Sequence, residues 1–331
     1  MNLHYNKAIA RDVVEREANG RNDDVAMKAY QLCEMTKQPN WRESISVLKV
    51  DQPLSWRLIR LIDGGEQEEL TFNIQGVISN NHLPPFLINT RYGVAGGSRI
   101  KFLKQGVAIV GLGDPNFDRA LENMDRLINV LSRHVPDGRL LPAEGRSGEG
   151  DEAQVDLINR YLTPRHEQPL GCEVPFANGV DPKNILRALT GKEYFHGEDN
   201  QVAYMERTHT NPAKYEEILP CKFRDGDVVE VQLSFTMTPV KGGNFKVQTI
   251  LRGITLLDGS VAEVSGPFSH TVKGKLKQDL KAAQQASQRE THAKVVQKPA
   301  RVPKRRMMYE IETKLKNCRI DNADEDMDDE V

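Results

Sequence analysis

The most regular hydrophobic pattern in the chain covers residues 223–259, FRDGDVVEVQLSFTMTPVKGGNFKVQTILRGITLLDG. From Val229 to Met237 every second residue is apolar, and polar residues occupy the positions between them. A period of two is typical of a β-strand with one buried face. The same alternation resumes after a KGGN turn, whose glycines can adopt positive φ at low cost. This pattern predicts two long antiparallel strands, with a bulge or bend near Gly253.

Helix-forming composition dominates the first 62 residues. The segments DVVEREANG and DDVAMKAYQLCEMTK favour helices, and NWRESISVLKV and PLSWRLIRLID are interpreted as the continuation of this helical region. A short alternating run, ELTFNIQGVIS, follows, in which Leu70, Phe72 and Ile74 share one strand face. The segment RIKFLKQGVAIVGLG adds a second β-like stretch. The first part of the chain is therefore predicted to be mainly helical with a small β-element.

The clearest helical pattern is NFDRALENMDRLINVLSRHV, where apolar residues recur at intervals of three and four. These residues are Leu121, Met124, Leu127, Ile128, Leu131 and Val135. Asn116 or Asp118 is available as its N-cap. AQVDLINRYLTP and DPKNILRALTG predict two shorter helices, the second of them with Asp181 as N-cap.

Two long curving strands suit a small closed barrel, which removes its own exposed edges. The predicted fold class is α+β, with a helical N-terminal region, a helix-plus-β-barrel domain of OB type and a disordered C-terminal tail. We place a mixed region at residues 1–150, the OB-like domain at 151–272 and the tail at 273–331. The segment 136–152, rich in Gly, Pro and charge, is the predicted linker.

The composition excludes several classes of protein. Four cysteines in 331 residues form no CxxC pair, which argues against a small disulfide-stapled domain. The N-terminus is charged and has no apolar core of a secretory signal. No apolar run approaches the roughly 20 residues that a membrane-spanning helix needs. We therefore expect a soluble intracellular protein with no membrane partner.

The formal net charge of -2 hides a strong asymmetry near the C-terminus. From residue 273 to residue 306 lysine and arginine prevail, and such a run attracts phosphates by counterion release. The alternative is a solvated charge run without a ligand. PARVPKRR resembles a basic nuclear-import signal, so nuclear localisation is expected. The acidic residues 324–330 could recruit a protein partner, pair with the basic run, or simply keep the end of the chain solvated.

The paired strands resemble the middle of OB-type single-stranded DNA-binding proteins. In that family a GDxVxVxxxF strand is followed by a glycine turn and a strand that ends in LxxVxLL. The matching residues here are Gly226, Asp227, Val229, Val231, Phe235, Leu251, Ile254 and Leu257. This resemblance implies a groove for a nucleic-acid strand and an acidic tail that competes for it. Residues 190–260 also resemble a family of uncharacterised fungal proteins, which implies no activity.

A protein that binds single strands needs cations along the phosphate path and aromatic faces on which bases stack. The predicted nucleic-acid-binding residues are Lys222, Arg224, Lys241, Phe245, Lys246, Arg252, Lys304, Arg305 and Arg306. Further aromatic candidates are Tyr194, Phe195, Tyr204 and Tyr215. In the alternative interpretation the phenylalanines belong to the core and the lysines protect strand edges. The predicted function is non-enzymatic binding of single-stranded DNA, and the alternative is a protein-interaction or scaffold module.

Fragments of enzyme motifs occur, but none is complete. VAIVGLGDPN lacks the third glycine of a dinucleotide-binding turn. EYFHGEDN brings His196, Glu198 and Asp199 into one loop, without further residues at a metal-ligand spacing. His166 and Cys172 together with His209 and Cys221 have the side chains of a zinc site, but their spacings fit no zinc pattern. No catalytic residue, metal or cofactor is predicted.

Overall fold

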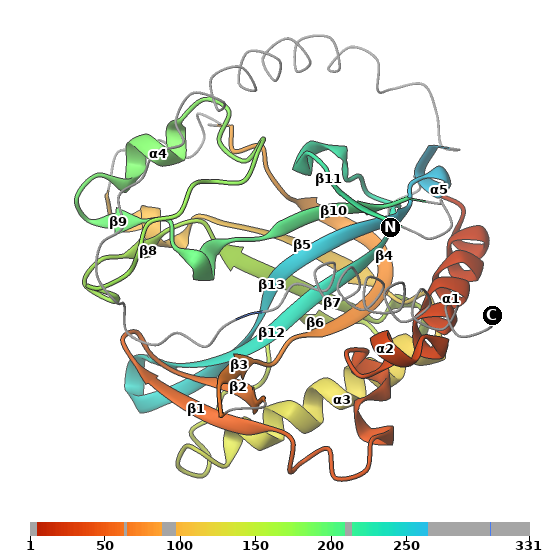
Figure 1. The fold of residues 1–331 in the computed structure, drawn as a ribbon, viewed down its shortest axis with the longest axis horizontal. Coiled ribbons are helices and arrows are strands. Elements are labelled where there is room, and N and C mark those ends of the chain that lie inside the picture. Colours follow the sequence, from red (N-terminus) through yellow and green to blue (C-terminus); the bar gives the residue numbers. More distant parts are fainter. Residues whose placement is uncertain (1–4, 63–64, 88–96, 209–213, 264–304, 306–331) are drawn as a thin grey trace, which may run out of the picture.

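The computed structural model describes residues 5–62, 65–87, 97–208, 214–263 and Arg305. Within them the protein is a mixed α+β structure dominated by one sheet of eleven strands (Figure 1). The α+β class is therefore confirmed. The tail residues 264–304 and 306–331 lie outside the described residues, and with them the predicted acidic cluster.

Five strands of the sheet pair in a ring. They are β4 (Phe72–His82), β5 (Lys104–Val110), β7 (Gln154–Arg160), β12 (Val228–Val240) and β13 (Asn244–Asp258). β12 pairs antiparallel with both β4 and β13, and β5 pairs antiparallel with both β4 and β7. The ring returns to its start where Ile158 of β7 pairs in parallel with Ile250 of β13. Side chains flank this junction on both sides, because Thr249 Oγ1 donates to the Asp156 carbonyl at 3.1 Å and Asn159 Nδ2 donates to the Leu251 carbonyl at 3.0 Å.

Short strands extend the sheet beyond the ring. The additional strands are β1 (Ser46–Asp51), β2 (Leu54–Leu61), β3 (Gln67–Glu69), β6 (Arg146–Ser147), β10 (Ala203–Arg207) and β11 (Tyr215–Glu217). β2 pairs with the distal half of β12 and with β1 and β3, whereas β10 pairs with β13 and β11. Strands from both sides of residue 150 belong to this one sheet, and β6 at residues 146–147 pairs with β7. The predicted boundary at residue 150 therefore does not separate two sheets.

Two of the predicted helices are strands. Residues 46–61, expected to be helical, form the β1–β2 hairpin, and residues 154–160 form β7. The reason is the same in both cases. The middle of β2 is buried on both faces, so its sequence lacks a period of two, and the short run VDLIN in β7 suits either period. Long-range pairing with β12 and β5 then decides the conformation.

The predicted hairpin of β12 and β13 is confirmed. Gly242 and Gly243 at its turn have φ of 82° and 73°. Gln232 pairs with Gly253 and Leu233 pairs with Leu251, which leaves Arg252 as the extra residue of a bulge. One expectation was wrong, because the polar positions of β12 are buried as well as the apolar ones. These polar positions are Glu230, Gln232, Ser234 and Thr236.

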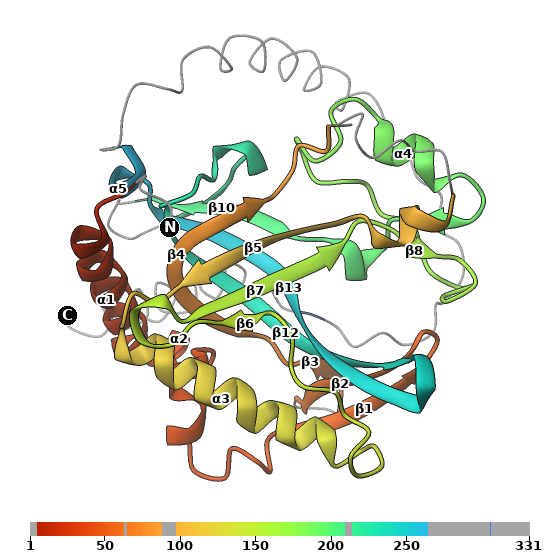
Figure 2. The same ribbon diagram turned by 180° about the vertical axis from the view of Figure 1, so that it is seen from behind.

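Helices cover the sheet on two sides. The helix α3 (Pro115–Ser132) runs beneath the strands in Figure 2 and contributes Phe117, Met124 and Leu127 to the main core. The helix was predicted, but its N-cap is Asp114, whose carboxylate accepts from the Phe117 amide at 3.0 Å. The helix α1 (Lys7–Asp23) forms a second core with the sheet.

The remaining elements are short. They are α2 (Val25–Lys28), η1 (Leu32–Lys37), η3 (Gly97–Phe102), η4 (Gly150–Glu152), β8 (Thr163–Pro164), α4 (Ile185–Thr190), β9 (Tyr194–Phe195), η5 (Glu198–Asn200), η6 (Pro220–Lys222), η7 (Lys241–Gly243) and α5 (Ser260–Glu263). The predicted helix α4 is present, but its N-cap residue is Asn184 and not Asp181. The Asp181 carboxylate still accepts from the first helical amide, that of Ile185, at 2.7 Å. None of the helices in the described ranges is both long and apolar enough to cross a membrane.

Candidate nucleic-acid interface

One face of β5 and β7 is turned away from the main core. Val107 and Ile109 of β5 and Val155 and Leu157 of β7 are buried in the main core. Since side chains alternate along a strand, the intervening residues face the opposite side. They are Lys104, Gly106 and Ala108 in β5, with Asp156, Ile158 and Arg160 in β7. Gly106 and Ala108 are buried, so solvent reaches β5 on this side at Lys104. Figure 2 shows these strands at the front, and α1 packs on Val77 of β4 and Val110 of β5.

An exposed aromatic ring lies at one end of this face. Phe102, the last residue of η3, has 68% of its surface exposed to solvent, and the Lys101 ammonium lies 5.0 Å from the ring centroid. Two residues later Lys104 begins β5, where it pairs with Arg160 at the end of β7. The Tyr161 amide donates to the Leu103 carbonyl at 3.0 Å, which fixes the backbone beside the ring. The strand ladder therefore holds one exposed aromatic and three cations together; we call Lys101, Phe102, Lys104 and Arg160 the Phe102 cluster.

Arg160 is also paired with an acid, since its Nη1 lies 2.8 Å from Glu167 Oε2. Lys101 and Lys104 are exposed. The sequence analysis did not single out the Phe102 cluster. The available signal was the stretch RIKFLKQG, in which cations flank an aromatic residue just before a strand.

Three predicted binding residues lie near the turn of the β12–β13 hairpin. Lys241 is exposed at the turn, in η7. Phe245 is half-buried and packs edge-to-face on Trp56, with ring centroids 5.3 Å apart. Lys246 forms an ion pair with Glu144. Phe245 therefore packs within the protein, as in the alternative interpretation of the sequence, and Lys241 is the residue of the three that the structure presents at the surface.

Two further predicted residues lie at the other end of β12. Lys222 is exposed with its Nζ 3.6 Å from Glu206 Oε2, and the exposed Arg224 precedes the strand. Because β12 has 13 residues and a strand rises about 3.3 Å per residue, the two ends lie on the order of 40 Å apart along the strand. The structure thus does not bring Lys222 and Arg224 together with Lys241.

The prediction for Arg252 needs correction. Its side chain is only 2% exposed, because the bulge directs it under β3 and η5 rather than to the surface. Nη2 lies 2.6 Å from Glu69 Oε1, Nε donates to Ser234 Oγ at 2.8 Å, and Nη1 donates to the Asp199 carbonyl at 2.8 Å. Its guanidinium is fully occupied by the protein. The further aromatic candidates Tyr194, Phe195 and Tyr204 are buried too.

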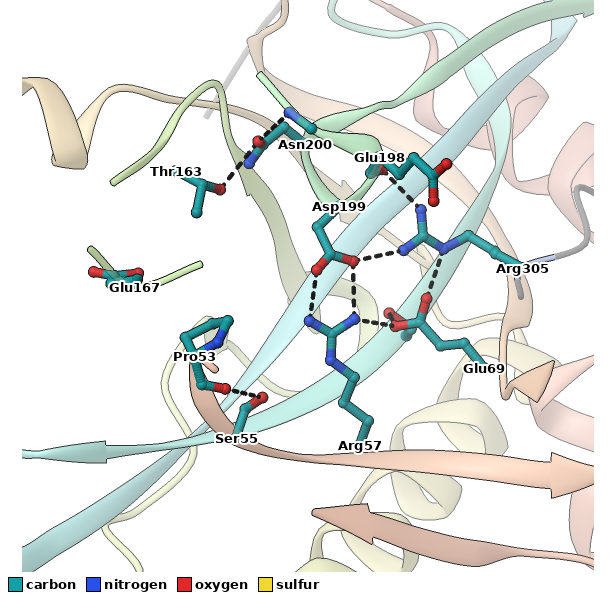
Figure 3. A network of polar contacts seen from close by, with 12 residues as sticks. Pro53, Ser55, Arg57, Glu69, Thr163, Glu167, Glu198, Asp199, Asn200 and Arg305 are labelled. Atoms are coloured by element: carbon teal, nitrogen blue, oxygen red, sulfur yellow. Dashed lines mark hydrogen bonds and ion pairs between the residues drawn. The ribbon is translucent and has the colours of Figure 1, made fainter. Parts of the chain in front are cut away.

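Arg252 belongs to a network of ions between the sheet and η5 (Figure 3). Arg57 of β2 donates to both carboxylate oxygens of Asp199, at 2.8 and 2.6 Å. Arg305 donates from Nε to Glu69 Oε2 at 2.6 Å and from Nη2 to Asp199 Oδ1 at 3.1 Å. Its third nitrogen, Nη1, donates to the Glu198 carbonyl at 3.2 Å. The neighbouring predicted residues Lys304 and Arg306 lie outside the described residues.

Burial and charge act against each other in this network. Burial would raise the pKa of Glu69, but Arg252, Arg305 and Arg57 together lower it to about 2. Burial likewise opposes ionisation of Asp199, and the three arginines hold its pKa below the usual range. Burial and the charge of Arg305 lower the pKa of Arg252 to about 10. All these groups are therefore charged at neutral pH.

The loop that carries Asp199 also contains His196 and Glu198, and the sequence suggested these three residues as a possible metal-binding or acid–base group. His196 is buried and its Nδ1 donates to the Tyr161 carbonyl at 2.8 Å, while burial lowers the pKa of the imidazole. Glu198 is exposed, and Asp199 binds Arg57. The three side chains therefore have separate structural environments. Over the described part of the chain, no group of three or more His, Cys, Asp or Glu residues is placed to hold a metal ion.

Comparisons with known proteins give a likeness at the level of structure. No protein-family model and no curated protein matches the chain, so the resemblance to uncharacterised fungal proteins gains no support. The structure of gp2.5, a single-stranded DNA-binding protein encoded by bacteriophage T7, is similar with a TM-score of 0.33 and 11% identity, covering 69% of this chain and 98% of that chain. A truncated single-stranded DNA-binding protein from bacteriophage Enc34 gives a TM-score of 0.32 and 12% identity, covering 69% of this chain and 99% of that chain. These likenesses assign no role to any residue.

Proposed function

We propose that this protein binds single-stranded nucleic acid, in the first place single-stranded DNA, and catalyses no reaction. The observation that carries the proposal is the Phe102 cluster. A phenylalanine ring exposed to 68% just before β5 is free to stack on a base, and stacking contributes about 1–3 kcal/mol per base. Lys101, Lys104 and Arg160 would neutralise the phosphates beside that base.

The ring of five strands supports a barrel of OB type. In such a barrel the face of the second and third strands, with the loops between strands one and two and between strands four and five, binds oligonucleotides. Counted along the ring, the second and third strands are β5 and β7. The Phe102 cluster lies at the end of these strands, and Lys241 lies in the turn between the fourth and fifth. Residues 72–258 are proposed to act as one binding unit.

The C-terminal charges belong to the same proposal. The basic run would add affinity that does not depend on sequence, and PARVPKRR would direct the protein to a nucleus. The acidic residues 324–330 would recruit a protein partner.

Substitution of Phe102 tests the function directly. We expect Phe102→Ala to weaken binding of a fluorescein-labelled oligo-dT about 5- to 100-fold, because one stacked base is lost. Phe102→Trp should keep the affinity. Leu61→Ala is a matched control, since Leu61 is an apolar residue on β2 with 62% exposure. Fluorescence anisotropy at two salt concentrations gives the affinities.

Two outcomes would contradict the proposal. If Phe102→Ala and Leu61→Ala bind alike, the Phe102 cluster is not the binding surface. If binding is insensitive to salt or absent, the protein does not bind phosphates, and a protein-interaction module becomes the better interpretation.

A further inference from the structure

Arg305 is held by a set of acceptors that matches a guanidinium. Three of its nitrogens each meet a different oxygen: Glu69 Oε2, Asp199 Oδ1 and the Glu198 carbonyl. A guanidinium presents its N–H donors in a rigid planar fork, whereas an ammonium is a compact charge without this geometry. Figure 3 shows the three acceptors on one side of the Arg305 side chain, which is 13% exposed. We call these three acceptors the arginine socket.

Resident arginines fix the orientation of both carboxylates. Glu69 Oε1 already accepts from Ser234 and Arg252, so Oε2 is the oxygen that meets Arg305. Arg57 binds Asp199 through both oxygens and orients that carboxylate from the β2 side. Residues of β3 and η5 therefore form the socket, and Arg57, Arg252 and Ser234 on the sheet hold its carboxylates.

The charge balance indicates that Arg305 can leave. Arg57 and Arg252 on the sheet already compensate the charges of Glu69 and Asp199. Arg305 adds a third cation to two carboxylates, and Arg252 and Arg305 repel one another. Release of Arg305 thus leaves a balanced cluster, whereas loss of a resident arginine would leave an uncompensated buried charge.

We propose that the arginine socket binds the guanidinium of Arg305 of the same chain as a releasable latch. A ligand tethered to the same chain acts at an effective concentration on the order of mM, which favours it over arginines of other molecules. This latch does not rest on the proposed nucleic-acid binding.

Hydrogen exchange of the full chain tests the latch. In Arg305→Ala, amide exchange at residues 197–201 and 67–69 should become at least several-fold faster, because the guanidinium that bridges Glu69, Glu198 and Asp199 is lost. Arg306→Ala is the matched control and should exchange like the wild type. Equal behaviour of the two variants, or no change in Arg305→Ala, would overturn the proposal.

Two further arms test the chemistry and the source of the ligand. Arg305→Lys should exchange as fast as Arg305→Ala, since lysine lacks the fork; wild-type protection in this variant would show that charge alone suffices and would overturn a guanidinium-specific socket. Protection in the wild type should be unchanged by a hundredfold dilution. Protection that falls on dilution would mean that a second copy supplies the arginine, and the latch within one chain would be refuted.

Discussion

At the scale of single residues, Glu69 shows how a buried charge is kept ionised. Its carboxylate is 1% exposed, and burial alone would raise its pKa. Arg252 and Arg305 bind its two oxygens at 2.6 Å, and Arg57 lies 3.9 Å away. These cations reverse the effect of burial. The ionisation of Glu69 and the docking of Arg305 are consequently linked, because each favours the other.

This linkage has a defined pH dependence. The folded-state pKa of Glu69, about 2, lies below its ordinary value of about 4.3. A depressed carboxyl pKa stabilises the folded state above the ordinary value, and the stabilisation is lost as pH falls towards the folded-state value. The difference in unfolding free energy between the wild type and Arg305→Ala should therefore be constant from pH 5 to 8 and shrink below about pH 4. Urea unfolding at each pH measures this difference. If the difference is unchanged at pH 3, the ionisation of Glu69 does not contribute to the binding of Arg305.

At the scale of elements, the residues that begin and bend an element are set by local chemistry. Asp114 precedes α3 with an extended backbone, and its carboxylate caps the Phe117 amide. Asp118, which the sequence offered as a cap, lies inside the helix. The helix carries Phe117, Leu127 and Leu131 into the main core, so its first turn positions part of the core beneath the ring of strands.

Removal of this cap should therefore lower the stability of the folded protein. We expect Asp114→Ala to lower the free energy of unfolding by about 0.5–2 kcal/mol, the usual range for an N-cap aspartate. Asp118→Ala changes an acidic residue four positions later and should have a smaller effect, because an acid in the first turn contributes about 0.3–1 kcal/mol with the helix dipole. Chemical denaturation compares the two. A larger loss for Asp118→Ala would mean that Asp114 is not the cap.

The elements that could be predicted are those whose pattern is local. The β12–β13 hairpin carries its alternation, its glycine turn and the bend near Gly253 within one continuous stretch. The helix α3 could be predicted for the same reason, because its apolar pattern lies within one continuous stretch. β2 and β7 were not, because their strand conformation depends on pairing with β12 and β5. The socket is a stronger case, since Glu69, Asp199 and Arg305 come from three distant parts of the chain and no local pattern connects them. The exposure of Phe102 likewise depends on the position of η3 just before β5, which the sequence pattern does not give.

At the scale of the whole molecule, the described part of the chain contains two contrasting groups of cations. Arg57, Arg252 and Arg305 are engaged by carboxylates within the protein. Lys101, Lys104 and Lys241 are exposed on or beside the face of β5 and β7 or in the hairpin turn. A net charge near zero therefore conceals a difference between cations that hold the fold together and cations that solvent can reach.

The salt dependence of nucleic-acid binding should reveal this difference. Each cation that contacts a phosphate of a single strand contributes about 0.7 to the slope of log K against log salt. Arg305→Ala should leave the slope of oligo-dT binding unchanged, because the Arg305 guanidinium is held by Glu69 and Asp199. Lys104→Ala, at the Phe102 cluster, should reduce it by about 0.7. The comparison separates the two proposals.

If the wild type does not bind oligo-dT, the proposed function fails while the exchange test of the latch still stands. If Arg305→Ala reduces the slope as much as Lys104→Ala does, Arg305 leaves the socket for phosphate and the latch yields to nucleic acid.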